Sequence, residues 1–467
     1  MRYPLFGLGQ TGKSPNVTAQ QRINCYAEIQ KEEDKTKVAY YNLPGCEVFA
    51  DIGANPARGS YVMAVGAFMY TVNGDQLYQI SPNGTFVARG TLNTNSGNVG
   101  MTDNGVELMI VDGVNGYIFD TGTNIFSQIV SPGFPNGART CTYLGRRLIV
   151  EVQGTGQFQW SDIDDGLTWP GANVASAEQS PDNLLAVFVD RGQLILLGDK
   201  TTEFWGITTN ADQPYAAISG AVIEWGIASI YSIAKYNNST AWLARNRLGE
   251  VQVIQLQGYQ ATPITGQELG YTINRYDTVE DATAFAYMVN EHPMYQINFP
   301  TQGASWVYDQ STTAWQMPST NYGRHLANFA VNFVNKTRVT DYRDGKVHTF
   351  DPTHYTDSGE VIRRQIRGRH AFDEYPVSMD EVWIDMETGV GTPSGDGSNP
   401  MLMMRCSKDG GNSWSSERWV PAGKEGQFQT RASIRRWGTA RSDWVFEINY
   451  AEPTKFVIIG AWVDAGT

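Results

Sequence analysis

The sequence is poor in residues that form disulfides or bind metals. Its four cysteines, Cys25, Cys46, Cys141 and Cys406, lie far apart and form no Cys-x-x-Cys pair. This spacing argues against a zinc-finger pattern and a dense disulfide framework, so we expect reduced, buried thiols. The five histidines fall on predicted turns or strand ends without the spacing of metal ligands. We therefore predict no metal site and no cofactor.

Positive charge, long apolar runs and catalytic motifs are also scarce. The net charge of −13 argues against ordinary nucleic-acid binding, which needs a basic surface. No apolar run approaches the roughly 20 residues that span a bilayer, so we expect no membrane insertion. The sequence contains neither G-x-S-x-G nor H-E-x-x-H. Glu151, Glu203 and Glu224 are the only carboxylates near predicted strands that we retain as candidates for glycoside hydrolysis.

Residues 7–14 match the phosphate-loop pattern G-x-x-x-x-G-K-[ST], but their surroundings do not support nucleotide binding. A phosphate loop needs a buried strand before it and a helix after it. Only six residues precede Gly7, and Pro15 follows Ser14 at once. We interpret the segment as a flexible glycine-rich arm.

What the sequence does contain is a repeated unit of short strands and tight turns. Ser60 to Leu92 shows it best, with four apolar or alternating runs separated by Gly66-Ala67, Asn73-Gly74-Asp75 and Ser81-Pro82-Asn83-Gly84. Such turn residues between runs of about five strand-forming residues predict a four-stranded meander. The unit recurs to about residue 350, which predicts an all-β fold with a six- or seven-bladed β-propeller.

The segments on either side of the repeats predict two further parts. In residues 1–50, alternation over Arg22 to Ile29 and a partner run over Lys37 to Asn42 predict a hairpin, and Gly45 to Ala50 is expected to close the propeller ring. The propeller itself is assigned to residues 51–365. Separate strand patterns in residues 366–467 predict a β-sandwich-like domain.

Two segments share the pattern D-x-G-x-[ST]-W, which predicts Asp-box turns. In such a turn the aspartate accepts backbone N–H bonds, the glycine takes a positive φ and the tryptophan packs below. We interpret both as structural elements. The residues are Asp164, Gly166, Thr168 and Trp169 in the first segment and Ser407, Asp409, Gly411, Ser413 and Trp414 in the second.

A basic stretch lies close to the predicted domain boundary. It contains Arg363, Arg364, Arg367 and Arg369. Such a stretch suits either a phosphate or a carboxylate surface on a neighbouring subunit. Because the chain is acidic overall, we favour a subunit contact.

Six short segments resemble one known family. They are Ser14–Asn16, Gln21–Tyr26, Leu144–Arg147, Trp160–Asp162, Ala177–Asp182 and Thr202–Trp205. Together they resemble the packaged-DNA stabilisation proteins of short-tailed phages (podophages), also called tail hub or nozzle proteins. The run Glu178-Gln179-Ser180-Pro181-Asp182 is the strongest marker.

The resemblance implies a structural protein of the virion tail that is not an enzyme, and it supplies no catalytic residue. It implies a homo-oligomeric ring, expected to be a hexamer, which lies below the portal and adaptor ring, retains the packaged DNA and gives it an exit channel during genome ejection. It further implies attachment of other tail proteins such as fibres or spikes, and assembly in the host cytoplasm. DNA is expected to pass through the lumen without sequence-specific binding.

A second interpretation remains open at this point. The Asp-box pattern is also typical of sialidase-like β-propellers, and exposed tyrosines and tryptophans suit a glycan-binding β-propeller. Against the enzyme, the sequence has no R-I-P element, and its arginines cluster in turns and at residues 363–369.

Overall fold

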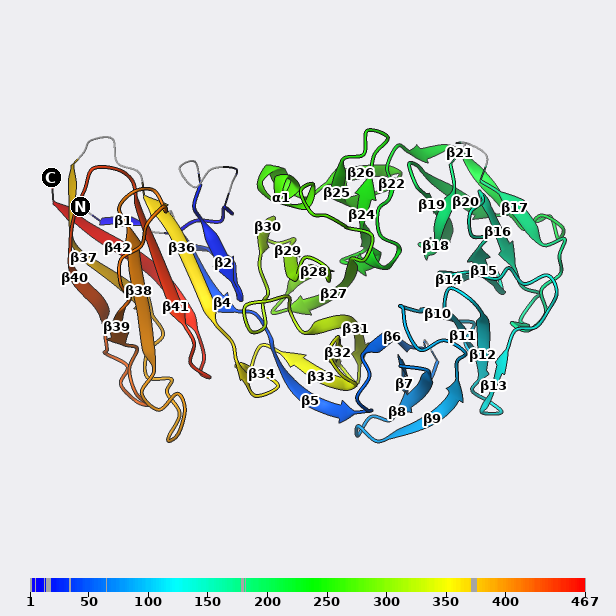
Figure 1. The fold of residues 1–467 in the computed structure, drawn as a ribbon, viewed down its shortest axis with the longest axis horizontal. Helices are drawn as coiled ribbons and strands as arrows, with labels where there is room; N and C mark the ends of the chain where they lie inside the picture. Colours follow the sequence, from blue (N-terminus) through cyan, green and yellow to red (C-terminus); the bar gives the residue numbers. More distant parts are fainter. Residues whose placement is uncertain are drawn as a thin grey trace.

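Short strands separated by tight turns make up most of the chain, and they form a propeller and a sandwich that lie side by side (Figure 1). The computed structural model describes the chain apart from residues 1, 5, 12, 14–17, 33–34, 64, 178–179, 181, 371–375 and 467. Within these described residues, the helical elements are α1 (Gly266–Ile273) and the 3-10 turn η1 (Ile230–Ser232). The all-β prediction is confirmed, although the strand pattern did not predict α1.

Seven blades surround a central axis in the part of the chain that the structure describes, which decides between six and seven. The first three blades are β6 (Ala57–Val62), β7 (Met69–Asn73), β8 (Gln76–Ile80) and β9 (Phe86–Thr91); β10 (Gly100–Asp103), β11 (Glu107–Val111), β12 (Gly116–Asp120) and β13 (Ile125–Gln128); and β14 (Cys141–Leu144), β15 (Arg147–Glu151), β16 (Gln157–Trp160) and β17 (Val174–Ser176).

The next three blades follow the same order from the axis outward. They are β18 (Leu184–Asp190), β19 (Gln193–Gly198), β20 (Thr202–Ile207) and β21 (Tyr215–Ile223); β22 (Gly226–Ile227) and β23 (Ala234–Tyr236), both paired with β24 (Ser239–Arg245), then β25 (Val251–Gln257) and β26 (Gln260–Pro263); and β27 (Thr283–Val289), β28 (His292–Phe299), β29 (Ala304–Asp309) and β30 (Ala314–Gln316).

The blades stack through apolar side chains on both faces of their central strands. Every residue of β7 is buried, and Val72 belongs to one core with Leu108 and Ile110 of the second blade. A strand covered on both faces needs consecutive apolar residues rather than alternation, as β11 has from Leu108 to Val111. The turn after β7 forms because Gly74, at φ 56°, adopts the left-handed conformation that tight hairpins require.

The seventh blade is completed by a strand from the beginning of the chain. It consists of β31 (Ala327–Phe333), β32 (Lys336–Asp341), β33 (Lys346–Asp351), β5 (Gly45–Asp51), β34 (Thr356–Asp357) and β35 (Glu360–Val361). β5 lies antiparallel to β33, with Cys46 opposite Phe350 and Ala50 opposite Val347. The prediction that Gly45 to Ala50 closes the ring is confirmed.

Two packed sheets form the sandwich, and both include strands from the first fifty residues. One contains β3 (Cys25–Glu32), β4 (Lys35–Asn42), β42 (Val457–Gly466), β37 (Val377–Met386), β40 (Ala432–Ala440) and β1 (Arg2–Pro4), which pairs with β42; the other contains β2 (Gln21–Ile23), β36 (Arg364–His370), β41 (Trp444–Tyr450), β38 (Met401–Ser407) and β39 (Arg418–Pro421). Val382, Met404 and Phe446 belong to the core that the two sheets share. The predicted hairpin is present as β3–β4, and it is part of the sandwich.

Asn24 connects the two domains at the point where the chain passes from β2 to β3. Its side-chain Nδ2 donates to the carbonyls of Ser319 and Arg363 at 2.8 and 2.9 Å, and its Oδ1 accepts from the Ser319 amide at 2.8 Å. Its own amide donates to Met317 in the sixth-blade region. Asn24 sits at φ 54°, a conformation that asparagine tolerates better than most residues. One side chain therefore links the hairpin, a loop after the sixth blade and the entry to β36.

Asn24→Ala is expected to destabilise the protein by about 2–3 kcal/mol, because three side-chain hydrogen bonds of about 1 kcal/mol each are lost. Asn238→Ala is the matched control, since Asn238 also has a positive φ of 57° but lies exposed on a turn of the fifth blade. Urea unfolding followed by tryptophan fluorescence measures both. Equal urea midpoints for the two variants would show that the side-chain hydrogen bonds of Asn24 add no stability, and that asparagine is needed there only for its positive φ.

Candidate functional site

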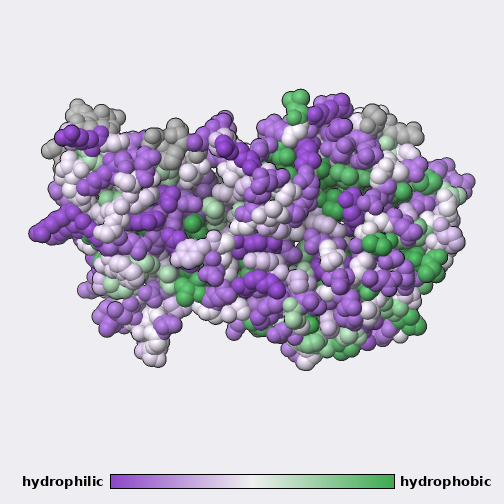
Figure 2. Space-filling model, viewed as in Figure 1, coloured by the Kyte–Doolittle hydropathy of each residue, from purple (hydrophilic) through white to green (hydrophobic). Residues whose placement is uncertain are grey.

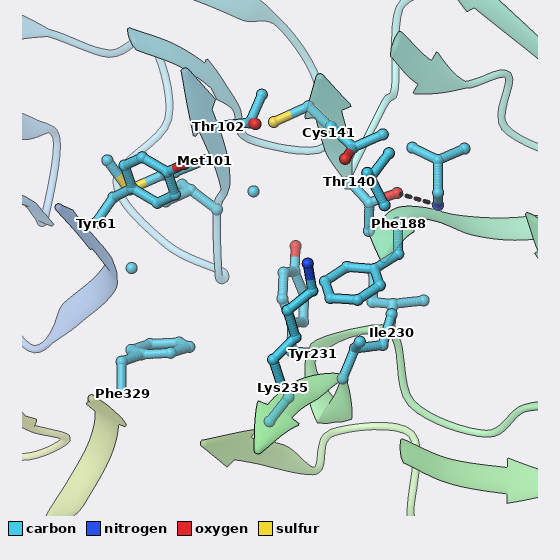
Figure 3. Close-up of a pocket in the computed structure, with 18 of the residues that line it drawn as sticks. Tyr61, Met101, Thr102, Thr140, Cys141, Phe188, Ile230, Tyr231, Lys235 and Phe329 are labelled. Carbon is cyan, nitrogen blue, oxygen red and sulfur yellow. Dashed lines mark hydrogen bonds between the residues drawn. The ribbon is translucent and has the colours of Figure 1, made fainter. Parts of the chain in front are cut away.

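The innermost strands of the blades enclose a cavity of about 600 Å³ on the propeller axis. Figure 3 shows aromatic side chains from four different elements around it: Tyr61 from β6, Phe188 from β18, Tyr231 from η1 and Phe329 from β31. The Tyr231 hydroxyl donates to the carbonyl of Asn98 at 3.0 Å. This bond holds the Tyr231 ring in the cavity and links η1 to the loop before the second blade.

The side chains that line this cavity, called the propeller channel below, are mainly aromatic or uncharged. The Tyr61 hydroxyl donates to Asp103 Oδ1 at 3.0 Å, and burial together with Asp103 raises the pKa of Tyr61, so the phenol stays protonated. Lys235 is balanced by Asp190 at 3.6 Å. Asp103 is the one carboxylate among the described lining residues. Hydrolysis by two carboxylates requires a pair roughly 5 to 9.5 Å apart, and these lining residues do not supply one.

The three glutamates retained from the sequence lie outside the described channel lining. Glu151 is fully buried and accepts hydrogen bonds from the amides of Arg139 and Thr140 and from the Thr140 hydroxyl, so it anchors the start of β14. Burial raises its pKa to about 7. Glu203 accepts from the Trp205 indole at 3.1 Å, and the exposed Glu224 lies 3.9 Å from Arg247. These contacts belong to the fold rather than to a shared site.

The second predicted Asp-box has the expected geometry. Asp409 Oδ1 accepts from the amides of Asn412 and Ser413, its Oδ2 accepts from the Ser413 hydroxyl, and the Ser407 hydroxyl donates to Oδ1. The hydrogen bonds from Ser407 and Ser413 lower the pKa of Asp409. Gly411 has φ 107°. The turn thus follows β38 as a rigid hydrogen-bonded loop.

The first predicted Asp-box is built differently. Asp164, at φ 53°, forms an ion pair with Arg146, and it is Asp165 whose Oδ1 accepts from the amides of Leu167 and Thr168. Gly166 donates its amide to Glu107 of the second blade at 2.9 Å, and its carbonyl accepts from the Trp169 indole at 2.8 Å. The spacing alone assigned the turn aspartate one residue too early.

The predicted basic stretch forms an arginine cluster around one buried carboxylate. Glu447 on β41 is fully buried, with Arg367 and Arg405 each at 2.6 Å and Arg363 at 3.8 Å. Burial acts to raise the pKa of Glu447, but the hydrogen bonds from Asn449 and Arg367 and the charges of Arg367 and Arg405 outweigh it, so the pKa lies below its ordinary value. Arg367 and Arg405 also stack on the Trp414 ring at 4.9 and 4.8 Å. The second Asp-box and the arginines therefore form one unit.

The remaining two arginines of the stretch have separate surroundings. Arg364 is fully buried, and its guanidinium donates to the carbonyls of Glu452 and Tyr355 at 2.9 and 3.1 Å. Arg369 forms an ion pair with Asp443. Of the four predicted contact residues, Arg363, Arg367 and Arg369 keep part of their surface open, whereas Arg364 is enclosed by its own chain. The subunit contact itself stays a prediction.

The described residues of the phosphate-loop pattern serve a packing role. The buried Arg22 guanidinium donates to the carbonyls of Gly7 and Leu8 at 2.9 and 3.0 Å, and also to the Trp315 carbonyl at 3.1 Å. These carbonyls accept from an arginine, whereas a phosphate loop presents backbone N–H groups. Gly12 and Ser14 of the pattern lie outside the described residues.

Part of the strongest family marker fixes the connector between the third and fourth blades to the fourth blade. Asp182 Oδ2 accepts from the Lys200 and Thr201 amides at 3.1 and 2.9 Å. Glu203 Oε1 accepts from the Ser180 amide at 3.3 Å. Glu178, Gln179 and Pro181, like Ser14 to Asn16, lie outside the described residues.

One group of side chains has the chemistry of metal ligands, although no spacing pattern in the sequence indicated it. Cys46, His325 and Asp357 are all buried, and their ligand atoms lie within 4.8 Å of one another. Their positions in the sequence are far apart, and only the closure of the ring by β5 brings them together. The prediction that no metal is bound is not tested by this geometry.

Exposed apolar side chains also mark the surface of the propeller. Figure 2 shows patches of hydrophobic residues over the propeller half of the molecule. Exposed residues of the first two blades and their loops include Val87, Val106, Ile125 and Val130. Single exposed apolar residues are normal on soluble proteins, so these four alone do not define a docking surface.

Comparisons with known proteins match both domains. A family model described as the beta-propeller of bacteriophage P22 Gp10 matches residues 1–355, and one described as its beta-sandwich matches residues 363–466. The tail hub protein gp10 of Salmonella phage P22 is 26% identical over 323 residues. That match covers 66% of this chain and 66% of the relative, which is slightly less than two thirds of the relative's length.

Solved structures show more distant similarity. The extracellular domain of the putative hybrid two component system BT4673 from B. thetaiotaomicron has a TM-score of 0.45 at 7% identity, covering 77% of this chain and 45% of that one. BamB from Moraxella catarrhalis has a TM-score of 0.40 at 9% identity, covering 71% and 97%. Separately, none of the helices within the described residues is both long and apolar enough to cross a membrane.

Glu447→Gln is expected to destabilise the sandwich by about 3 kcal/mol at pH 7, because it leaves the surrounding arginines without their buried partner. The pKa of Glu447 is lowered in the folded state, so its contribution is fully present above about pH 4.5. It is lost as the pH falls through the folded-state pKa, and the difference between wild type and variant should shrink there.

Glu280→Gln is the control for this prediction, because the Arg245–Glu280 pair is exposed and such pairs contribute about 0–1 kcal/mol. Urea unfolding at several pH values measures both variants. A Glu447→Gln variant as stable as Glu280→Gln at pH 7 would contradict the structural role given to the cluster.

Proposed function

Because the chain belongs to the bacteriophage P22 Gp10 family, we propose that it is a tail hub protein, a structural component of the virion of a short-tailed phage. The observation that carries the proposal is the match of two family models, one for each domain and in the same order. The two matches together span nearly the whole chain, so the proposal does not rest on the propeller alone, a fold that many unrelated activities share.

The proposed assembly is a ring, a hexamer below the portal and adaptor, that retains the packaged DNA and provides its exit channel. Other tail proteins, such as fibres or spikes, attach to its outer surface. The net charge of −13 supports a lumen that repels phosphate, through which the genome slides during ejection without sequence-specific binding. The propeller axis holds a cavity of about 600 Å³ with aromatic rings among its lining, and we do not assign the DNA path to it. The proposed DNA channel is instead the axis of the ring.

A groove between the sixth blade and the sandwich is the surface we assign to the neighbouring subunit. It has a volume of about 550 Å³ and is lined by Tyr322, Val361 and Arg363, among others. The Tyr322 side chain is 80% exposed, and the Arg363 guanidinium lies 5.1 Å from its ring centroid. Exposed tyrosine and arginine side chains beside apolar surface are the composition of interface hot spots. This assignment keeps Arg363 of the predicted contact residues at the interface. Arg363 directly precedes β36, the strand that carries Arg367 and Arg369.

The sialidase-like and glycan-binding alternatives have less support. The Asp-box turn is used to position Trp414 against arginines of its own domain. The channel offers one described carboxylate, Asp103, whose Oδ1 is already hydrogen-bonded to Tyr61. Cleavage of a sialoside by the purified chain would favour the enzyme instead.

The mass of the purified chain by light scattering, alone and with the portal–adaptor assembly, tests the ring. We expect a sixfold complex in at least the second condition.

Tyr322→Glu should raise the protein concentration needed for half-maximal assembly at least tenfold, because it places a charge in the groove. Leu248→Glu, at a position 92% exposed on the fifth blade, should leave it unchanged. A chain that stays monomeric with the portal–adaptor assembly contradicts the proposed function.

Binding to double-stranded DNA tests the repelling lumen. At low salt, where phosphate contacts are strongest, we expect the assembled ring to show no retention of a short duplex in a filter assay. A basic protein of similar mass serves as the positive control. Tight binding that weakens steeply as salt rises would show that the lumen is basic.

A further inference from the structure

Three buried side chains meet where the closing strand enters the seventh blade. Cys46 lies on β5, His325 lies just before β31, and Asp357 lies on β34, which runs next to β5 in Figure 1. Cys46 and Asp357 are direct partners in the parallel pairing of β5 with β34. The sulfur, ring nitrogen and carboxylate oxygen lie within 4.8 Å of one another, and the three residues are 1%, 3% and 2% exposed.

The group contains polar atoms that lack partners among the described residues. Asp357 Oδ2 accepts from the Thr320 hydroxyl at 2.7 Å, but Oδ1 has no hydrogen-bond partner. His348 on the adjacent strand β33 is fully buried, and its Nε2 lies 3.5 Å from Asp341 Oδ2, although neither ring nitrogen makes a hydrogen bond of good geometry. A buried carboxylate oxygen without a partner is costly. An ion in contact with Oδ1 removes this cost.

We propose that Cys46, His325 and Asp357 bind a structural Zn²⁺ ion at the closure of the propeller. A thiolate, an imidazole and a carboxylate form a mixed sulfur, nitrogen and oxygen ligand set, which suits Zn²⁺ and disfavours Ca²⁺ and Mg²⁺, ions that prefer oxygen alone. Structural zinc is four-coordinate. His348 stands on the strand paired with β5 but is not among the three residues whose ligand atoms lie within 4.8 Å of one another, and its Nε2 contacts Asp341 at 3.5 Å. It can serve as the fourth ligand only by turning away from Asp341, and otherwise a water molecule takes that position.

The surrounding residues fit this role. The Thr320 hydroxyl fixes the Asp357 carboxylate, as residues behind metal ligands commonly do. Binding releases the Cys46 thiol proton to solvent, so the thiolate and the carboxylate together balance the two charges of the ion. The Ala327 amide donates to His325 Nδ1 at 3.2 Å. If Zn²⁺ binds Nδ1 of His325, this hydrogen bond is lost. If Zn²⁺ binds Nε2, the hydrogen bond to Nδ1 is compatible with the ion.

The ion would connect three segments that are remote in sequence. β5 comes from the start of the chain, His325 precedes the last full blade, and β34 leads toward the sandwich strand β36. A metal bound here therefore holds the ring closed and fixes the chain that joins the two domains. This proposal concerns the fold of one subunit, so it stands or falls independently of the ring assembly.

Metal content of the tag-free, full-length chain, produced with zinc and passed through a desalting column, is the direct test. We expect one zinc per chain by mass spectrometry, and a lower melting temperature after removal with a chelator. Cobalt(II) added to the metal-free chain should give a thiolate-to-cobalt charge-transfer band and the intense visible bands of four-coordinate cobalt. A chain that binds neither zinc nor cobalt, or binds cobalt without the thiolate band, overturns the proposal.

Variants identify the ligands. Cys46→Ser should remove the charge-transfer band, whereas Cys141→Ser, which changes a cysteine of the propeller channel, should keep it. Thr320→Val retains all proposed ligands and should weaken zinc binding by about tenfold to a hundredfold in competition with a chromogenic chelator. If Cys46→Ser fails to fold, the wild-type cobalt spectrum and the Thr320→Val affinity decide the matter. An unchanged affinity in Thr320→Val contradicts the Asp357 ligand.

Discussion

The antiparallel pairing of β5 with β33 is the interaction on which the rest of this structure depends. A propeller blade is stable only when both of its faces are covered by neighbours, so the last blade must meet the first. Here the strand that completes the seventh blade continues directly into β6 of the first blade. Ala50, Met69 and Val347 belong to one apolar core that spans the two blades. The channel, the blade stacking and the position of the buried Cys46 all follow from this closure.

The same segment of chain also determines how the two domains are joined. Before it reaches the seventh blade, it contributes β1 to β4 to the sandwich. Asn24 and the buried Arg22 then bond to the loop and strand at the end of the sixth blade. Two domains joined only by one linker usually move relative to each other. In this chain the crossing segment adds a second connection to the short link between β35 and β36.

The sequence predicted the features that depend on local pattern. Turn residues and strand periods gave the propeller, the closing strand, the hairpin and the sandwich, and the spacing around Asp409 gave its turn. It did not decide the blade number, because the repeats share no fixed residue that can be counted. It also placed the first turn aspartate at Asp164 instead of Asp165. The two residues are adjacent and of the same type, and only the backbone conformation determines which carboxylate accepts the amides of the turn.

Features that depend on contacts between remote residues were not accessible from the sequence. Arg364 looks like its neighbours in a basic run, yet strand alternation turns it into the interior while Arg363 and Arg367 face Glu447. No spacing relates Glu447 to those arginines, because the pairing of β36 with β41 brings them together across about 80 residues. The group formed by Cys46, His325 and Asp357 could not be predicted for the same reason, because the three residues are remote in sequence.

The crossing segment has a consequence for biosynthesis. Strands β1 and β4 pair with β42, and β5 pairs with β33, so the parts that leave the ribosome first find their partners last. At roughly 5–20 residues per second, about 20–80 s pass between the synthesis of β4 and that of its partner β42. During this time the early strands have unpaired edges, which favour association with other nascent chains. The late translation of the sandwich thus makes the yield of native protein sensitive to chaperones and to the concentration of growing chains.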